Sequence, residues 1–208
     1  MKNIRIIWLL VFLVIALVGC SPAALHGGQD EHANEGANSH QSNGEDFEPL
    51  KTQFSEDMVI GAPIADVFPL LDPVRESDWI PEWEADMIWS ESGFAEEGAI
   101  FQTALHGDVK ETWIISQYEP MKKIVFVRYN PSIITRLSIE LTDGHNHTDA
   151  AWTQSQIALD DNGNHFLSTL NQEDFSANIK DFEAMLNYYL ETGEMIDAEM
   201  LHKGDLSH

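Results

Sequence analysis

The clearest hydrophobic pattern in the chain lies near its C-terminal end, between Gln172 and Thr192. Apolar residues recur there at spacings of four, three, four and three, at Phe175, Ile179, Phe182, Leu186 and Tyr189. These spacings put them on one side of an α-helix, and polar residues such as Asn187 fall on the opposite side, where water can solvate them. Gly193 is a typical residue to end a helix. The pattern therefore predicts one long amphipathic helix whose apolar side needs a partner.

A different pattern, typical of β-strands, fills the chain from about residue 85 to residue 160. The predicted strands are 87–90, 100–103, 110–118, 123–129, 133–142 and 148–159. Turn-forming pairs such as Asn130-Pro131 and Asp143-Gly144 separate them, and a last turn is expected over 160–163. In 133–142, apolar Leu137, Ile139 and Leu141 alternate with polar residues, which indicates a sheet with one solvated face. The short links predict an antiparallel meander.

The region before these strands predicts one more strand and two short helices. Residues 52–60 are strand-like and end at Gly61-Ala62-Pro63, and 64–71 have the apolar spacing of a short helix. Asp72-Pro73 ends that helix, and a second short helix or turn covers 75–80. This element order is that of the helix-grip fold, an α+β architecture in which a curved antiparallel sheet wraps around a long C-terminal helix.

The N-terminus has the features of an export signal. Lys2 and Arg5 precede an apolar run over 6–17, followed by Leu-Val-Gly-Cys at 17–20. The run is shorter than the ~20 residues that a membrane-spanning helix needs. The four residues resemble the bacterial lipobox, which implies that residues 1–19 are removed and that Cys20 is lipidated. Cys20 is the only cysteine, so it leaves no partner for a disulfide.

The composition of the next segment predicts a tether. Residues 21–50 contain four glycines and three histidines, and they contain no aromatic residue before Phe47. The tether would be 20–50, with a single domain over 51–196 and a tail over 197–208. The histidines, His26, His32 and His40, lack the fixed geometry that a metal site requires. Because Ser21 follows Cys20, the resemblance implies a lipid-anchored protein of the bacterial envelope, on the periplasmic side of the outer membrane where the cell has one.

The net charge of −24 limits the partners of the chain. Loss of 1–19, which carry two basic residues and no acid, would lower it to −26. A phosphate backbone needs basic residues for neutralisation, so a nucleic acid is excluded as a partner. An anionic lipid surface would also repel the domain. Two explanations of the charge stay open, solubility in a saline environment and a cationic partner.

Several short runs resemble the SRPBCC family, which is related to START lipid-transfer domains, birch-pollen-allergen proteins and polyketide cyclases. They lie at 62–71, 73–76, 78–83, 111–113 and 186–194. The resemblance covers about residues 54–196 and implies the helix-grip fold. It leaves the activity open, because the family includes carriers, cyclases and hydrolase-like enzymes.

A sheet curved around a helix leaves room for a pocket, and the chain is rich in aromatic residues suited to line it. The candidate ligand-binding residues are Trp79, Trp83, Phe101, Trp113, Phe126, Arg128, Trp152, Phe182, Leu186 and Tyr189. A guanidinium such as that of Arg128 or Arg136 would clamp a ligand carboxylate. The alternative is that the arginine faces outward and pairs with an acid such as Glu111 or Glu140.

The spacing of acidic and histidine residues along the sequence does not identify a catalytic pair. The acid and base candidates are Asp78, Glu82, Glu84, His106, Glu111 and His165, and no spacing brings two of them together. His145 and His147 provide two metal ligands without a third. No nucleophile elbow, phosphate loop or dinucleotide fingerprint is present, and we expect neither a metal nor a cofactor.

The leading hypothesis is an envelope lipoprotein that binds a hydrophobic or amphipathic small molecule inside its domain. One alternative is a cyclase-like or dehydratase-like enzyme that uses the same cavity, and another is a protein-interaction module of the envelope. An enzyme should have a buried acid or base with a perturbed pKa in the pocket, and a carrier a mostly apolar lining. An interaction module should have a filled pocket and an apolar patch on its exterior.

Overall fold

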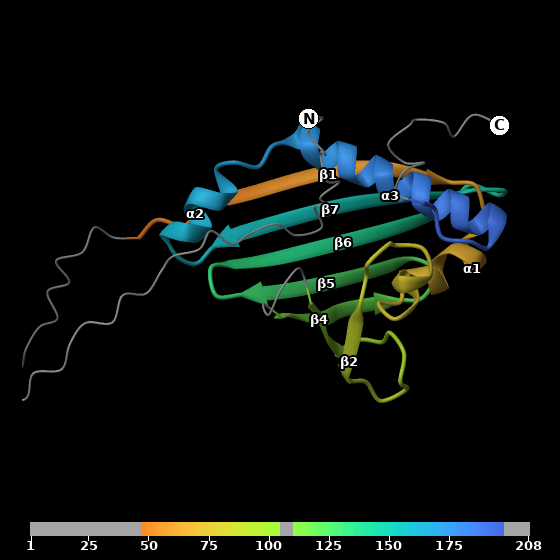
Figure 1. Ribbon diagram of the computed structural model, residues 1–208, viewed down its shortest axis with the longest axis horizontal. Coiled ribbons are helices and arrows are strands. Elements are labelled where there is room, and N and C mark those ends of the chain that lie inside the picture. Colours follow the sequence, from red (N-terminus) through yellow and green to blue (C-terminus); the bar gives the residue numbers. More distant parts are fainter. Residues whose placement is uncertain (1–46, 105–109, 198–208) are drawn as a thin grey trace, which may run out of the picture.

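The computed structural model describes residues 47–104 and 110–197. Within them, a seven-stranded antiparallel sheet in the order β1-β7-β6-β5-β4-β3-β2 curves around a long helix, α3 (Figure 1). The strands are β1 (Lys51–Ile60), β2 (Ala85–Trp89), β3 (Ile100–Ala104), β4 (Lys110–Glu119), β5 (Lys123–Asn130), β6 (Ile133–Asp143) and β7 (Thr148–Ala158). Strands β2 to β7 form the predicted meander, and β1 pairs with β7. The predicted α+β architecture is confirmed.

Short helices connect β1 to β2. The first is α1 (Ile64–Val67), which continues as the 3-10 helix η1 (Phe68–Leu71), and the second is the 3-10 helix η2 (Arg75–Asp78). The predicted helix over 64–71 changes type after Val67, next to Pro69, because proline has no N–H for an α-helical hydrogen bond. These elements lie at one end of the sheet beside α3 (Figure 1).

A helix that the sequence patterns did not predict, α2 (Asp161–Leu167), follows β7. The expected turn over 160–163 is its start, since the carboxylate of Asp160 accepts a hydrogen bond from the Gly163 backbone N–H at 2.8 Å. A Cβ on Gly163 would lie 2.2 Å from the carbonyl oxygen of Ser132, so this close approach requires glycine. Leu167 then packs in a small second core at the ends of β6 and β7.

The long helix α3 (Gln172–Thr192) has the predicted bounds. The side chain of Asn171 accepts a hydrogen bond from the Asp174 N–H at its start, and Gly193 ends it in the left-handed conformation, with φ of 73°. Its buried side chains face the concave side of the sheet and are Ile179, Phe182, Met185 and Leu186. Among the described residues, no helix combines the length and hydrophobicity needed to cross a membrane.

One flank of α3 covers the open edge of β1. The Asn187 side chain donates to the Val59 carbonyl at 3.0 Å and accepts from the Gly61 N–H at 2.7 Å, and Glu183 accepts from the Val59 N–H at 2.9 Å. The expectation that Asn187 only faces water is therefore wrong, because the sheet edge offers backbone groups that need partners. These bonds hold α3 along the sheet edge.

Candidate functional site

The concave face of the sheet, α3 and the segment around η2 enclose a small cavity. Six aromatic rings line it, those of Trp83, Phe101, Trp113, Phe126, Trp152 and Phe182. Ile80, Leu137 and Glu76 complete the lining. The cavity volume is about 20 Å³, which is room for about one water molecule.

Ring contacts hold one wall of the cavity together. Phe101 of β3 stacks on Trp113 of β4 with ring centroids 5.4 Å apart and an interplanar angle of 13°. Phe126 of β5 lies edge-on to both rings, at 6.0 and 6.2 Å. These three residues are at most 3% exposed, so the wall is rigid and preformed.

The opposite wall comes from β7 and α3. Trp152 stacks on Phe182 with centroids 5.8 Å apart and an interplanar angle of 22°. The indole Nε1 of Trp152 is buried and has no hydrogen-bond partner among the described residues. An indole N–H usually finds a partner when buried, so this donor is unusual for a residue that lines a cavity.

Glu76 is the one residue of the lining with an ionisable side chain. It lies in η2 and is 7% exposed, and no described side chain or backbone group forms a hydrogen bond with its carboxyl group. Burial, together with the negative charge of Asp72, raises the pKa of Glu76 to about 8. Glu76 is therefore mostly protonated at neutral pH and places a neutral carboxylic acid against the aromatic rings.

Asp72 is held in place by backbone groups. Its carboxylate accepts hydrogen bonds from the N–H of Val74 at 2.9 Å and of Ala95 at 2.7 Å. Its backbone carbonyl accepts from the N–H of Glu76 at 2.9 Å. The charge next to Glu76 is thus fixed by the turn that precedes η2.

Arg128 points into the fold and is paired there. Its Nη1 lies 2.6 Å from Glu111 Oε2, both side chains are buried, and its guanidinium carbon lies 5.3 Å from the Trp113 ring centroid. Its Nη2 also donates to the Thr135 hydroxyl at 3.2 Å. Burial lowers the pKa of Arg128 to about 10, while Glu111 opposes this, so Arg128 stays charged at neutral pH. The outward orientation considered for Arg128 is wrong, but the predicted pairing with Glu111 is present.

The candidate ligand-binding residues divide between cavity and core. Trp83, Phe101, Trp113, Phe126, Trp152 and Phe182 line the cavity. Trp79 and Leu186 are fully buried core residues, and Trp79 donates its Nε1–H to the Leu70 carbonyl at 2.9 Å. Tyr189 is half-buried at the margin of the core.

The acid and base candidates are not brought together. Asp78 pairs with Arg75 at the surface, at 2.6 Å, whereas Glu82, Glu84 and His165 are exposed. His106 lies outside the described residues, as do Cys20, the signal, most of the tether and nearly all of the tail. His145 and His147 lie in the β6–β7 hairpin, and the described residues contain no group of three potential ligands arranged for a metal.

Glu76 was missing from the sequence candidates. A signal was present, since Glu76 precedes the buried Trp79 and Ile80 by three and four residues, a spacing that puts it on the same side of a helical turn. An acid on the apolar side of a short helix indicates a buried carboxyl group.

Comparisons with known proteins establish the fold. No protein-family model matches the chain, and no curated protein matches it. Norcoclaurine synthase from Thalictrum flavum is 9% identical with a TM-score of 0.51, over 70% of this chain and 99% of that chain. Ara h 8.0201 is 12% identical with a TM-score of 0.51, over 69% and 99%.

A third similar structure is DynU16, a protein of the dynemicin biosynthetic locus. It is 19% identical with a TM-score of 0.51, over 68% of this chain and 48% of that chain, so this chain spans about half the length of DynU16. Identities this low speak for the fold alone. The described domain has the helix-grip fold that these structures share.

Proposed function

We propose that this chain is a lipid-anchored protein of the bacterial envelope whose helix-grip domain binds a hydrophobic or amphipathic small molecule. The observation that carries the proposal is the cavity beneath α3, where six aromatic rings accompany the buried carboxyl group of Glu76, and where the Trp152 N–H has no hydrogen-bond partner among the described residues. A mostly apolar lining with few polar groups is typical of small-molecule sites.

A structure of the same fold gives this proposal support. Norcoclaurine synthase has been crystallised in complex with dopamine and hydroxybenzaldehyde, at a TM-score of 0.50 and 10% identity to this chain. That protein holds small aromatic molecules on the same scaffold. The residues that would do so here are this chain's own.

Ligands larger than water require one wall to move. Glu76, Ile80 and Trp83 form the wall that does not belong to the sheet or to α3, and the last two lie in the irregular segment between η2 and β2. Trp83 is half-buried, and its indole N–H donates to the Pro73 carbonyl at 2.8 Å. Rotation of Trp83 would break one hydrogen bond and one edge contact with Trp113, so this wall is the least costly to displace.

The anchoring part of the proposal rests on the sequence. The lipobox-like residues 17–20 and the tether composition of 20–50 support a domain held near a membrane surface. The acidic charge of the chain opposes adhesion of the domain itself to anionic lipids.

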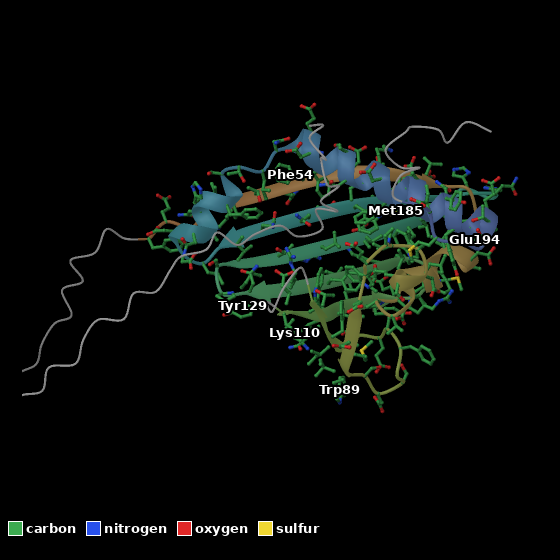
Figure 2. The ribbon with its side chains drawn as sticks, viewed as in Figure 1. Phe54, Trp89, Lys110, Tyr129, Met185 and Glu194 are labelled. Carbon is green, nitrogen blue, oxygen red and sulfur yellow. The ribbon has the colours of Figure 1, made fainter. Side chains whose placement is uncertain are left out.

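Titration with the neutral fluorescent probe N-phenyl-1-naphthylamine tests the binding proposal. The chain from residue 20 carrying Cys20→Ala should bind about one probe per molecule, and Trp113→Ala should weaken binding about tenfold or more through lost burial and stacking. Leu137→Phe, which fills the cavity, should also weaken binding. Trp89→Ala is the control, because Trp89 is 53% exposed and lies at the outer end of β2 (Figure 2). Unsaturable binding, or equal binding by all variants, would refute a cavity site.

Glu76 favours a second function, that of a cyclase-like or dehydratase-like enzyme. A carboxylic acid that stays protonated at neutral pH can donate a proton to a bound carbonyl compound. In that case Glu76→Gln would abolish turnover of the ligand and leave its binding in place. A ligand recovered unchanged from the wild type would speak against catalysis.

A further inference from the structure

The charge distribution around the cavity identifies the class of its ligand. Glu76 contributes one carboxyl group, and the charged group whose field reaches it is another carboxylate, Asp72. None of the residues that line the cavity in the described ranges is basic. The guanidinium of Arg128 lies over the ring of Trp113, which lines the cavity, but it is paired with Glu111.

The aromatic rings also favour a positive ligand charge. The face of an aromatic ring is negative and attracts a cation, and the attraction is stronger where water is excluded. Six such rings line a cavity that also contains a buried carboxyl group. A buried carboxyl without a hydrogen-bond partner is costly when ionised, and an ammonium group that donates to it would remove that cost.

We infer that the cavity binds an organic cation, a protonated amine with an apolar body, whose ammonium group pairs with Glu76 while the rings enclose its alkyl or aryl part. This inference rests on the proposed function and specifies its ligand. The indole N–H of Trp152 is then available to an oxygen atom on the same ligand. Bound anions are disfavoured, because the negative charge of Asp72 acts on the position of Glu76 and would act on them too.

Pairing of the ligand ammonium group with Glu76 changes the number of protons that the protein holds. At neutral pH the free protein has a proton on Glu76, and the bound ammonium stabilises the carboxylate, so the Glu76 proton leaves to the buffer when the amine binds. No bond to carbon forms or breaks. Other titratable groups on the elements around the cavity include Tyr118 on β4, Arg75 and Asp78 in η2, Tyr189, Lys180 and Glu183 on α3, and the Arg128–Glu111 pair. None of these lines the cavity.

Three ligands of similar size and different charge test the inference. Butylamine, butan-1-ol and butyrate would be titrated calorimetrically into the full chain in phospholipid nanodiscs, with empty nanodiscs as the blank. At about pH 8.5 the amine should bind about tenfold more tightly than the alcohol, and butyrate most weakly. At about pH 6.5, titrations in buffers of different ionisation enthalpy should show release of close to one proton with the amine and none with the alcohol.

Glu76→Gln should abolish the proton release and bring the amine and alcohol affinities within about twofold of each other. Glu84→Gln is the matched control, because it removes an exposed carboxylate from the same segment and should behave as the wild type. If the alcohol binds as tightly as the amine, or Glu76→Gln keeps the preference, the inference is overturned and the binding proposal stands. If none of the three probes nor N-phenyl-1-naphthylamine binds, both are overturned.

Discussion

At the scale of single residues, Glu76 stands out as a buried acid with a raised pKa. Its carboxyl is buried without a hydrogen bond next to the charge of Asp72, and it would be far more stable in water. Groups kept at such a cost tend to occur at functional sites. Ligand binding in this cavity is therefore expected to depend on Glu76.

The same burial makes stability depend on pH. In the unfolded chain the carboxyl ionises near its ordinary pKa of 4.5, whereas in the folded chain it keeps its proton until about pH 8. The folded state thus binds one more proton than the unfolded state between these values, and stability falls as pH rises. Relative to Glu76→Gln, the wild type should lose about 1.4 kcal/mol of unfolding free energy per pH unit in this window.

Urea unfolding of both proteins at several pH values between 5 and 8 measures this difference. The difference between the two proteins cancels the contributions of other groups to the pH dependence. Glu96 and Glu119 are examples, because hydrogen bonds lower their pKa values and their contributions change at acidic pH. Parallel stability curves for wild type and Glu76→Gln would show that Glu76 ionises normally.

At the scale of elements, α3 has two roles on two of its sides. Its apolar side, with Phe182 and Leu186, closes the main core and one wall of the cavity, while its polar flank bonds the backbone edge of β1. Figure 2 shows Met185 on α3 over the sheet, and this residue is fully buried. The helix therefore fixes both the sheet edge and the cavity wall.

Truncation of Phe182 tests the apolar side. Phe182 is 4% exposed, stacks on Trp152 and contacts Trp79 edge-on at 6.1 Å. Phe182→Ala should lower the free energy of unfolding by about 3–5 kcal/mol, whereas Glu191→Ala, an exposed position on α3, should change it by less than about 0.5 kcal/mol. Chemical denaturation measures both. Similar losses in the two variants would contradict the observed orientation of the helix.

At the scale of the whole molecule, the proposed lipid anchor and the net charge would act together. A chain with a net charge of −24 is repelled by anionic lipid headgroups, so a lipid at Cys20 would be what keeps it at a membrane. More than one acyl chain is needed for a stable anchor, because a single chain binds only marginally.

Cys20→Ala tests the anchor. The variant should no longer incorporate a radioactive fatty acid and should accumulate as an unprocessed precursor, because the residue that resembles the lipidation site is gone. Gel mobility and labelling of cells that express each form provide the measurement. Persistent labelling of the variant would exclude the lipoprotein proposal.

The sequence alone determined the elements whose signals are local. Helix α3 is an example, because the spacing of its apolar residues and its end at Gly193 are all contained within the segment. The strands followed from alternation and turn residues in the same way. Together these signals predicted the fold class, and the structure confirms it.

Only the tertiary structure decided features that depend on distant groups. The turn over 160–163 became the start of α2 because Gly163 packs against the backbone of Ser132, a contact that spacing does not predict. The partner of Arg128 was chosen by the register of β4 and β5, which brings Glu111 within 2.6 Å. Likewise Trp79 and Trp83, four residues apart, divide between core and cavity. Local periodicity determines which side of an element a side chain takes, but the space left between side chains depends on how residues from several elements pack.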